Sequence, residues 1–132
     1  MALIGQHKVR AGLVVLVVED HEPIRRLQAN ALHSWGYEVL TASNADEALR
    51  CLAESHADLL ITDIRLPGRL DGIALLRAVK RGWADIKVAI VSGLTDELAS
   101  EDVEDLRAFS DAMLTKPFKL HELEALVANL IG

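Results

Sequence analysis

Short, uninterrupted apolar runs alternate along this chain with stretches in which apolar residues recur every three or four positions. The continuous runs lie at residues 13–18, 59–62, 88–91 and 112–115. Uninterrupted runs are typical of strands covered on both faces, whereas the wider spacing is typical of helices with one buried face. The pattern therefore predicts an α/β fold in which strands and helices alternate.

Five strand–helix units fit this alternation. Asn44 with Glu47 three residues later resembles a capping box, and Pro23 suits a first helical turn. The predicted strands are residues 13–18, 37–42, 59–63, 86–91 and 112–115. The predicted helices run from Pro23 to Gly36, from Asn44 to before Asp58, from Ile73 to Gly82, from Thr95 or Asp96 onward, and through residues 120–130.

Four of the predicted helices carry an apolar stripe that would face a sheet, while the fourth helix along the chain is polar. The stripes consist of Ile24, Leu27, Ala31, Leu32 and Trp35; Ala48, Leu49 and Leu52; Ile73, Leu76 and Val79; and Leu120, Leu123, Leu126, Val127 and Leu130. Strands joined by helices form parallel sheets with right-handed crossovers. We therefore expect a doubly wound, five-stranded parallel sheet between two layers of helices.

The size of the chain suits one compact domain. It has 132 residues, of which 51% are hydrophobic and 26% are charged, and this composition differs from that of disordered chains. Residues 1–12 contain only a short apolar stretch and lack the long apolar core of a signal peptide. We expect a loose leader at residues 1–12 and one folded domain at residues 13–132.

Charge and cysteine content argue against several classes of function. The net charge of −6 disfavours binding to the phosphate backbone of nucleic acids. The longest apolar run, residues 13–18, is far shorter than a membrane span. Cys51 is the only cysteine, so no intrachain disulfide can form, which suits a reducing compartment. We expect a cytoplasmic protein with no direct contact with nucleic acid and no membrane span.

Reactive side chains stand where four of the predicted strands end. Glu19 and Asp20 follow the first run, Asp63 follows the run at 59–62, Ser92 follows the run at 88–91, and Lys116 with Pro117 follows the last. Ligands of open parallel sheets bind at the carboxyl ends of the strands. A strand-end aspartate or a Ser-Gly pair alone is usually a turn or cap, so the joint placement carries the prediction of a site.

The residue types predict metal-assisted phosphoryl chemistry. Three carboxylates in one cleft repel one another unless a cation lies among them, and a small set of oxygen ligands suits Mg²⁺. Asp63 could then act as a nucleophile toward phosphorus, with Lys116 neutralising charge on the transferred oxygens. Ser92 offers a hydroxyl donor, and Gly93 leaves room for the backbone to approach. The histidines lack the spacing of a zinc site.

Four segments, VLVVEDHEPIR, ADLLITDIRLPGRLDGIALL, VAIVSG and AMLTKPF, resemble the motifs of response-regulator receiver domains of bacterial two-component signalling. The resemblance covers roughly residues 13–131. It implies a flavodoxin-like (βα)5 receiver fold of three layers. It also implies a phosphoacceptor switch that takes a phosphoryl group from a histidine kinase or a histidine phosphotransfer protein, with an unknown protein as downstream target.

The resemblance also assigns roles to individual residues. Asp63 would be the phosphoacceptor, and Lys116 would contact the phosphoryl group. The peptide bond between Lys116 and Pro117 would be cis. Mg²⁺, for which Mn²⁺ is an expected substitute, would be held by Asp20, Asp63 and the backbone carbonyl of Arg65, with Glu19 in support. Ser92 would be the switch hydroxyl. The helix that carries Ile24 and Leu27 would meet the phosphodonor.

Three positions depart from the common pattern of the family. Met113 stands where many members have an aromatic switch residue, so the switch would rely on a flexible side chain. Leu94 and Arg65 follow the switch hydroxyl and the phosphoacceptor by two residues, where they would shield the acyl phosphate and slow its hydrolysis. Leu126 replaces an arginine of the regulators that dimerise through their last helices, and this disfavours that type of dimer.

Two other functions and one question of context stay open at this point. An aspartate-nucleophile phosphatase would also use magnesium and lysine, but it usually has a second aspartate at the position of Arg65, so we expect a receiver and not a turnover enzyme. A phosphorylation-independent, receiver-like interaction module is the other alternative. The chain would be either a stand-alone regulator or a receiver cut from a larger protein.

Overall fold

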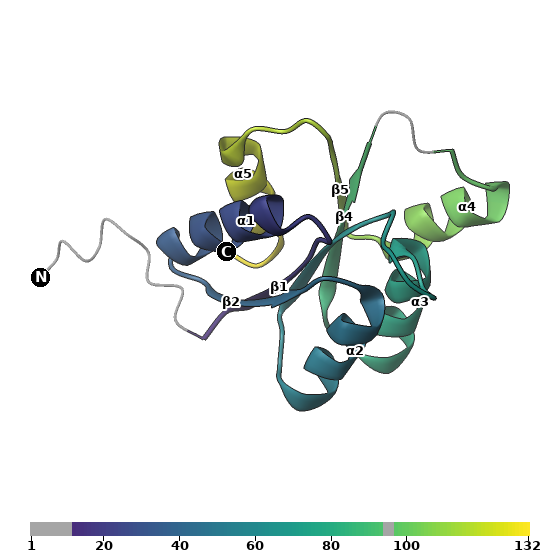
Figure 1. Cartoon of the computed structure of the whole chain (residues 1–132), viewed down its shortest axis with the longest axis horizontal. Coiled ribbons are helices and arrows are strands. Elements are labelled where there is room, and N and C mark those ends of the chain that lie inside the picture. Colours follow the sequence, from purple (N-terminus) through teal and green to yellow (C-terminus); the bar gives the residue numbers. More distant parts are fainter. Residues whose placement is uncertain (1–11, 94–96) are drawn as a thin grey trace, which may run out of the picture.

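Five parallel strands form one sheet in the order β2-β1-β3-β4-β5 in this computed structural model, which describes residues 12–93 and 97–132. The strands are β1 (Val14–Val18), β2 (Glu38–Ala42), β3 (Leu59–Asp63), β4 (Lys87–Ser92) and β5 (Ala112–Thr115). The helices are α1 (Glu22–Ser34), α2 (Ala45–Glu54), α3 (Gly72–Gly82), α4 (Ser100–Phe109) and α5 (Leu120–Leu130). The doubly wound α/β architecture expected from the sequence is confirmed (Figure 1).

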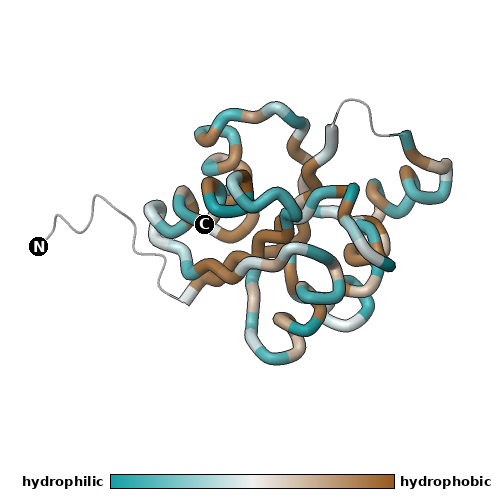
Figure 2. Tube along the Cα trace, viewed as in Figure 1, coloured by the Kyte–Doolittle hydropathy of each residue, from teal (hydrophilic) through white to brown (hydrophobic). Residues whose placement is uncertain are grey.

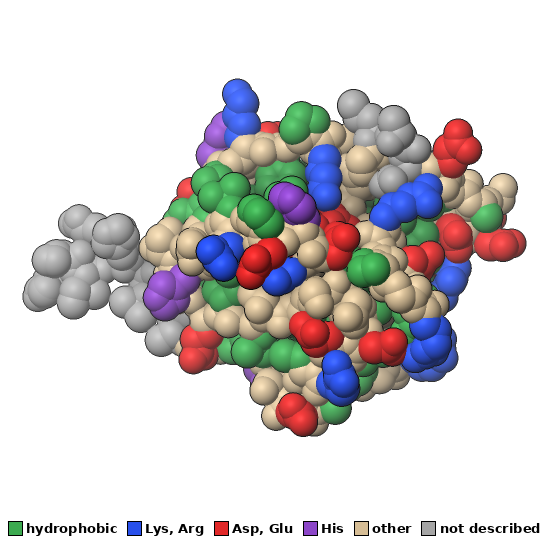
Figure 3. Space-filling model, viewed as in Figure 1, with side chains coloured by type: hydrophobic (Ala, Val, Ile, Leu, Met, Phe, Trp, Pro, Cys, Tyr) green, Lys and Arg blue, Asp and Glu red, His purple; other side chains and the backbone are tan. Residues whose placement is uncertain are grey.

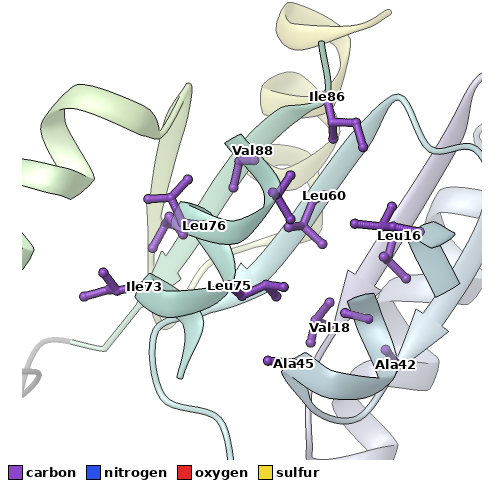
Figure 4. Close-up of a cluster of buried hydrophobic side chains, with 14 of the residues drawn as sticks. Leu16, Val18, Ala42, Ala45, Leu60, Ile73, Leu75, Leu76, Ile86 and Val88 are labelled. Atoms are coloured by element: carbon purple, nitrogen blue, oxygen red, sulfur yellow. The ribbon is translucent and has the colours of Figure 1, made fainter. Parts of the chain in front are cut away.

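The sheet separates two apolar cores, because side chains of alternating residues point to opposite faces of each strand. Leu16, Leu60 and Val88 face α2 and α3 on one side, as Figure 4 shows. Val15 and Ile61 face α1 and α5 on the other side, where Leu123 is also fully buried. The apolar strands lie at the centre of the molecule in Figure 2, between helices whose outer faces are hydrophilic. This arrangement is the three-layer fold.

Local sequence signals set the beginnings of two helices. The Asn44 side chain accepts a hydrogen bond from the Glu47 backbone N–H at 2.8 Å, and Glu47 Oε1 accepts one from the Ser43 N–H at 2.9 Å. These bonds satisfy N–H groups that the first turn of α2 leaves free. In the same way, the Asp71 side chain accepts a bond from the Ala74 N–H at the start of α3. The predicted helix start at Asn44 is confirmed.

The fourth helix begins later than the sequence predicted. Residues 97–99 are not helical, α4 starts at Ser100, and the predicted start at Thr95 or Asp96 lies outside the described residues. The polar residues of this segment gave no apolar period by which to place the start. Along α4, Leu106 is the buried side chain. The fourth helix therefore has a smaller apolar contact with the core than the sequence pattern of an α/β fold suggests.

Two predictions about apolar faces were wrong. The last run was expected to be covered on both faces, but Met113 is 48% exposed and Thr115 is also exposed, since α4 packs mainly beside α3. Leu27 and Leu120 were expected to face the sheet, but they are 55% and 39% exposed. Both leucines line an apolar hollow next to Gly93 and Lys116, at the carboxyl edge of the sheet.

Ion pairs join α3 to α4. Arg77 Nη2 lies 2.7 Å from Asp102 Oδ1, and Arg77 Nε lies 2.5 Å from Asp105 Oδ2. Lys80 pairs with Asp111, just before β5, at 2.8 Å. Figure 3 shows acidic side chains at the end of the molecule formed by α4, with basic side chains beside them toward α3. The acidic character of α4 is therefore partly neutralised within the chain.

The described structure begins at the last residue of the predicted leader. Residues 1–11 lie outside the described residues, and Gly12 forms a turn immediately before β1. No helix in the described ranges is long and apolar enough to cross a bilayer.

Candidate functional site

The carboxyl ends of β1 and β3 lie side by side, because these two strands are neighbours in the sheet although β2 separates them in sequence. From β1 the chain passes outward to β2 and then returns to the other side of β1 to form β3. The strand order reverses at this point, and such points are the usual ligand sites of doubly wound folds. The acid pair and Asp63 occupy this crevice.

The three carboxylates converge as expected. One carboxylate oxygen from each of Glu19, Asp20 and Asp63 lies within 4.8 Å of the others. Glu19 and Asp63 are buried, whereas Asp20 is exposed to solvent. Such a grouping is repulsive when all three are ionised, so it favours a proton or a cation at their centre.

Glu19 is held at its backbone and at one carboxylate oxygen. Its N–H donates to the Ala42 carbonyl at 3.1 Å, and its Oε2 accepts a bond from the His21 N–H at 3.0 Å. Its Oε1 is buried and has no hydrogen-bond donor among the described residues. A buried oxygen without a donor loses the hydration it had in water, so this oxygen is suited to a cation ligand.

Lys116 completes the charge arrangement. Its Nζ lies 3.0 Å from Asp63 Oδ1 and 3.5 Å from Glu19 Oε1. Its backbone N–H donates to the Ser92 carbonyl at 2.8 Å, which continues the β4–β5 pairing to the edge of the site. The Lys116–Pro117 peptide bond is cis, as the family resemblance implied. Lysine and phosphoacceptor candidate are thus in direct contact.

The electrostatics of the site raise the pKa of Asp63 toward neutral pH when no cation is bound. Burial, and then hydrogen bonding to Glu19, raise the pKa of Asp63 to about 7, while Lys116 opposes this shift. Burial would also raise the pKa of Glu19, but hydrogen bonds with Asp63 and the His21 N–H, together with the charge of Lys116, lower it. Burial disfavours the charge of Lys116, yet Asp63 and Glu19 raise its pKa overall. Below about pH 7, the proton of this carboxyl pair therefore lies on Asp63, and Glu19 is ionised.

This proton predicts an unusual pH dependence of stability. Asp63 has a pKa of about 7 when folded and an ordinary value of 3.8 when unfolded, so the folded state binds more protons between these values. The free energy of unfolding of the metal-free protein should therefore fall by about 1–3 kcal/mol as the pH rises from about 5 to 7. Urea unfolding in the presence of a chelator measures this slope.

Asp63→Asn supplies the control for the pH prediction, because the amide does not titrate. This variant should show a flatter profile over the same pH range and should be more stable than the unsubstituted chain above pH 7. Parallel profiles for the two proteins would contradict the assignment of the proton to Asp63.

Gly72 supports the backbone of Asp63, and the sequence did not reveal this role. Its N–H donates to the Ile64 carbonyl at 2.7 Å, and a Cβ at this position would lie 1.8 Å from the Asp63 carbonyl oxygen. The first turn of α3 therefore lies directly on the end of β3. Glycine at a helix start is a signal of close backbone approach, and this signal marks Gly72 in the sequence.

A cleft of about 270 Å³ opens beside the carboxylates. Its lining comprises Asp20, Asp63, Ile64, Arg65, Val91, Gly93 and Lys116. Ser92 is half-buried at the end of β4, beside this lining. The Arg65 side chain is exposed and donates to the Glu97 carbonyl at 3.3 Å. Five predicted site residues thus share one cleft, whereas Met113 points outward on β5 and Leu94 lies outside the described residues.

A second hollow of about 520 Å³ shares Gly93 and Lys116 with the cleft. It is mostly apolar and lies between α1 and the segment from β5 to α5. Its lining includes Ile24, Leu27, Gln28, Pro117, Phe118 and Leu120. The exposed leucines at its rim, Leu27 and Leu120, form an apolar surface next to the reactive lysine. This apolar hollow therefore opens directly beside the cleft, on the α1 side.

Comparison with known proteins agrees with this geometry. The model of the response regulator receiver domain family matches residues 15–128. The chain is 38% identical over 122 residues to the transcriptional regulatory protein AruR of Pseudomonas aeruginosa, covering 89% of this chain and 48% of that protein. It is 39% identical over 112 residues to the transcriptional regulatory protein KdpE of Mycobacterium tuberculosis, covering 85% and 48%. The chain spans about half the length of these curated relatives.

Solved structures show the same likeness. The receiver domain of NtrX from Brucella abortus superposes with a TM-score of 0.80 at 34% identity, covering 89% of this chain and 97% of that one. A receiver domain protein from Clostridium thermocellum also gives a TM-score of 0.80, at 30% identity and covering 90% and 94%.

The chain belongs to the response regulator receiver domain family. Its fold is the flavodoxin-like (βα)5 fold of that family, and its function is that of a receiver in two-component signalling. This family is not a family of turnover enzymes.

Proposed function

We propose that Asp63 accepts a phosphoryl group from a histidine kinase or a histidine phosphotransfer protein, and that this modification switches the domain. The observation that supports the proposal most directly is the pairing of a buried aspartate with a lysine, 3.0 Å apart, inside a cluster of three carboxylates. In the transfer, an Asp63 carboxylate oxygen forms a bond to phosphorus. The bond from phosphorus to the donor imidazole nitrogen breaks, and its electron pair stays on that nitrogen.

The donor set fits Mg²⁺, with Mn²⁺ as a substitute. The three close carboxylates supply the oxygen ligands that such a cation needs, and the buried Glu19 Oε1, which lies 3.5 Å from Lys116 Nζ, accepts no hydrogen bond among the described residues. We assign Asp20, Asp63 and the Arg65 backbone carbonyl as ligands, with Glu19 in support. When bound, the ion neutralises charge on the transferred oxygens.

Three further residues of the site have roles in phosphoryl transfer and switching. Lys116 favours the ionised, nucleophilic form of Asp63 and then pairs with a phosphoryl oxygen. The Ser92 hydroxyl donates to another phosphoryl oxygen, and Gly93 leaves space beside it. A phosphoryl group adds charge and acceptor oxygens at Asp63. It shifts the equilibrium between two conformations of the domain, and the size of the shift is limited by how much its contacts differ between them.

Loss of the phosphoryl group is expected to be slow. The Arg65 side chain extends from the cleft to the Glu97 carbonyl, where it can hinder the approach of water to the acyl phosphate. Leu94 is proposed to contribute shielding as well. Lys116 and the metal ligands nevertheless make the chain assist its own phosphorylation and the slow hydrolysis that follows, without being a turnover enzyme. Met113 and Pro117 are proposed to modulate the switch, Met113 from the exposed face of β5.

The apolar hollow beside Lys116 is the proposed docking surface for the phosphodonor. It adjoins the reactive cleft and is bordered by α1, so a donor helix seated there would bring its histidine toward Asp63. The downstream target is a protein of unknown identity, and we propose no direct contact with nucleic acid. We also propose that the receiver domain spans residues 13–132, after a leader, and works in the cytoplasm.

Intact-mass measurement after incubation with phosphoramidate and Mg²⁺ tests this function. The unsubstituted chain should gain the mass of one phosphoryl group, and Asp63→Asn should gain none. Addition to both proteins would place the acceptor elsewhere. Addition to neither, under conditions that phosphorylate a known receiver, would favour the phosphorylation-independent module.

A further inference from the structure

One side chain of α1 holds the backbone of the loop that carries two of the three carboxylates. Arg25 Nη1 donates to the Glu19 carbonyl at 2.8 Å and reaches the Asp20 carbonyl at 3.4 Å. The Arg25 backbone N–H also donates to the His21 carbonyl at 2.9 Å, which begins the helix. Arg25 therefore ties the acidic loop to the first turn of α1 through both its backbone and its side chain.

Besides the Glu19 N–H bond to the Ala42 carbonyl and the His21 N–H bond to Glu19 Oε2, the Arg25 contacts are the hydrogen bonds that hold this loop among the described residues. The loop spans only the residues between Val18 at the end of β1 and Glu22 at the start of α1. The helix cap, His21, makes no capping hydrogen bond with its side chain. Asp20 is exposed, so packing does not restrain its position. Charge-assisted bonds from a half-buried guanidinium are stronger than neutral ones and suit this task.

We propose that Arg25 is a positioning residue for the metal-binding carboxylates Glu19 and Asp20. This inference rests on the proposed function, because it assigns Arg25 a role toward the Mg²⁺ site. Mg²⁺ demands nearly ideal octahedral geometry, so carboxylates held in place before binding lose less conformational freedom on binding. Arg25 contacts the carbonyls of the loop and leaves the carboxylates available to the ion.

Positioning and simple electrostatics predict opposite effects of removing Arg25. If the guanidinium acted only through its positive charge, its loss would strengthen the binding of a cation nearby. If it orders the loop, its loss should weaken the binding, and groups that orient metal ligands typically contribute tenfold or more to affinity. The sign of the change therefore distinguishes the two roles.

Isothermal titration of the full chain with MgCl₂, without any phosphodonor, tests the proposal. Arg25→Met should bind Mg²⁺ roughly tenfold more weakly than the unsubstituted chain. Arg25→Lys, which keeps the charge on a shorter stem, should lie between the two. Arg26→Met is the matched control, because Arg26 is the adjacent arginine, exposed and paired with Glu22 at 3.3 Å. It should change the affinity by less than about twofold, since exposed charges are screened.

The unfolding midpoint of each variant in a chelator shows whether the metal-free fold is retained. Should Arg25→Met fail to fold, Arg25→Lys carries the test, with weaker binding than Arg26→Met as the expected result. Unchanged or tighter Mg²⁺ binding by the folded Arg25 variants would overturn the role of Arg25 and leave the proposed function standing. Absence of Mg²⁺ binding by the unsubstituted chain would overturn the metal site and the positioning role together.

Discussion

Replacing Lys116 with methionine is expected to slow the phosphorylation of Asp63 by a factor of roughly a hundred to a thousand, the usual cost of removing one preorganised charge at a reacting centre. The Lys116 ammonium lies 3.0 Å from Asp63 Oδ1 and is the cation that lowers the pKa of that buried carboxyl. Without it, Asp63 should keep its proton to higher pH, and charge on the transferred phosphoryl oxygens should lack a partner. The initial rate of mass addition from phosphoramidate at constant Mg²⁺ measures the effect.

Lys119→Met is the matched control for this experiment. Lys119 is an exposed lysine three residues further along the chain, just before α5, so its replacement removes the same charge outside the site. Its rate should equal that of the unsubstituted chain. Equal rates for the Lys116 and Lys119 variants would show that transfer does not depend on the contact between Lys116 and Asp63.

Replacing Gly72 with alanine is expected to destabilise the fold by about 2–4 kcal/mol, toward the upper end of the effects of added atoms in packed sites. The new Cβ would lie 1.8 Å from the Asp63 carbonyl oxygen and 2.8 Å from the Ile64 Cα. Both are backbone atoms of a buried strand end, so neither can move without displacing β3 or α3. The Asp63 side chain should be displaced as well, which should weaken Mg²⁺ binding. Urea unfolding and Mg²⁺ titration measure the two consequences.

Gly82→Ala tests the same substitution at the other end of α3. No atom lies within 4 Å of a Cβ built at Gly82, and the backbone there is not left-handed. This variant should be as stable as the unsubstituted chain or slightly more stable, because alanine restricts the unfolded state. Similar unfolding curves for the two variants would contradict the close approach of Gly72 to β3.

Strands and capping motifs were predictable because their signals are local. The run at residues 59–63 matches β3 at both ends, and the Asn44–Glu47 spacing marked α2 correctly. The start of α4 was not predictable, because its polar residues carry no apolar period. The exposure of Met113 depends on where α4 packs, and that is set by contacts with α3 that lie outside any local pattern.

The convergence of the carboxylates and Lys116 could be inferred from topology, since every one of these residues ends a strand or lies within two residues of its end. The supporting contacts could not be inferred in this way. Arg25 reaches backward across a helical turn to two carbonyls, and Gly72 touches a strand end nine residues earlier. Both contacts depend on the path of the chain after the strand, so they appear only when the backbone is in place.

The attachment of α4 has a consequence for how the domain responds to its medium. The neighbouring helix α3 buries Ile73, Leu75, Leu76 and Val79, whereas α4 contributes one buried leucine and is joined to α3 by the bonds between Arg77 and two aspartates that are about one-third exposed. Ions dissolved around the protein weaken such pairs but leave apolar packing intact. A rise in ionic strength should therefore weaken the attachment of α4 to α3 more than it weakens the packing of α3 on the sheet.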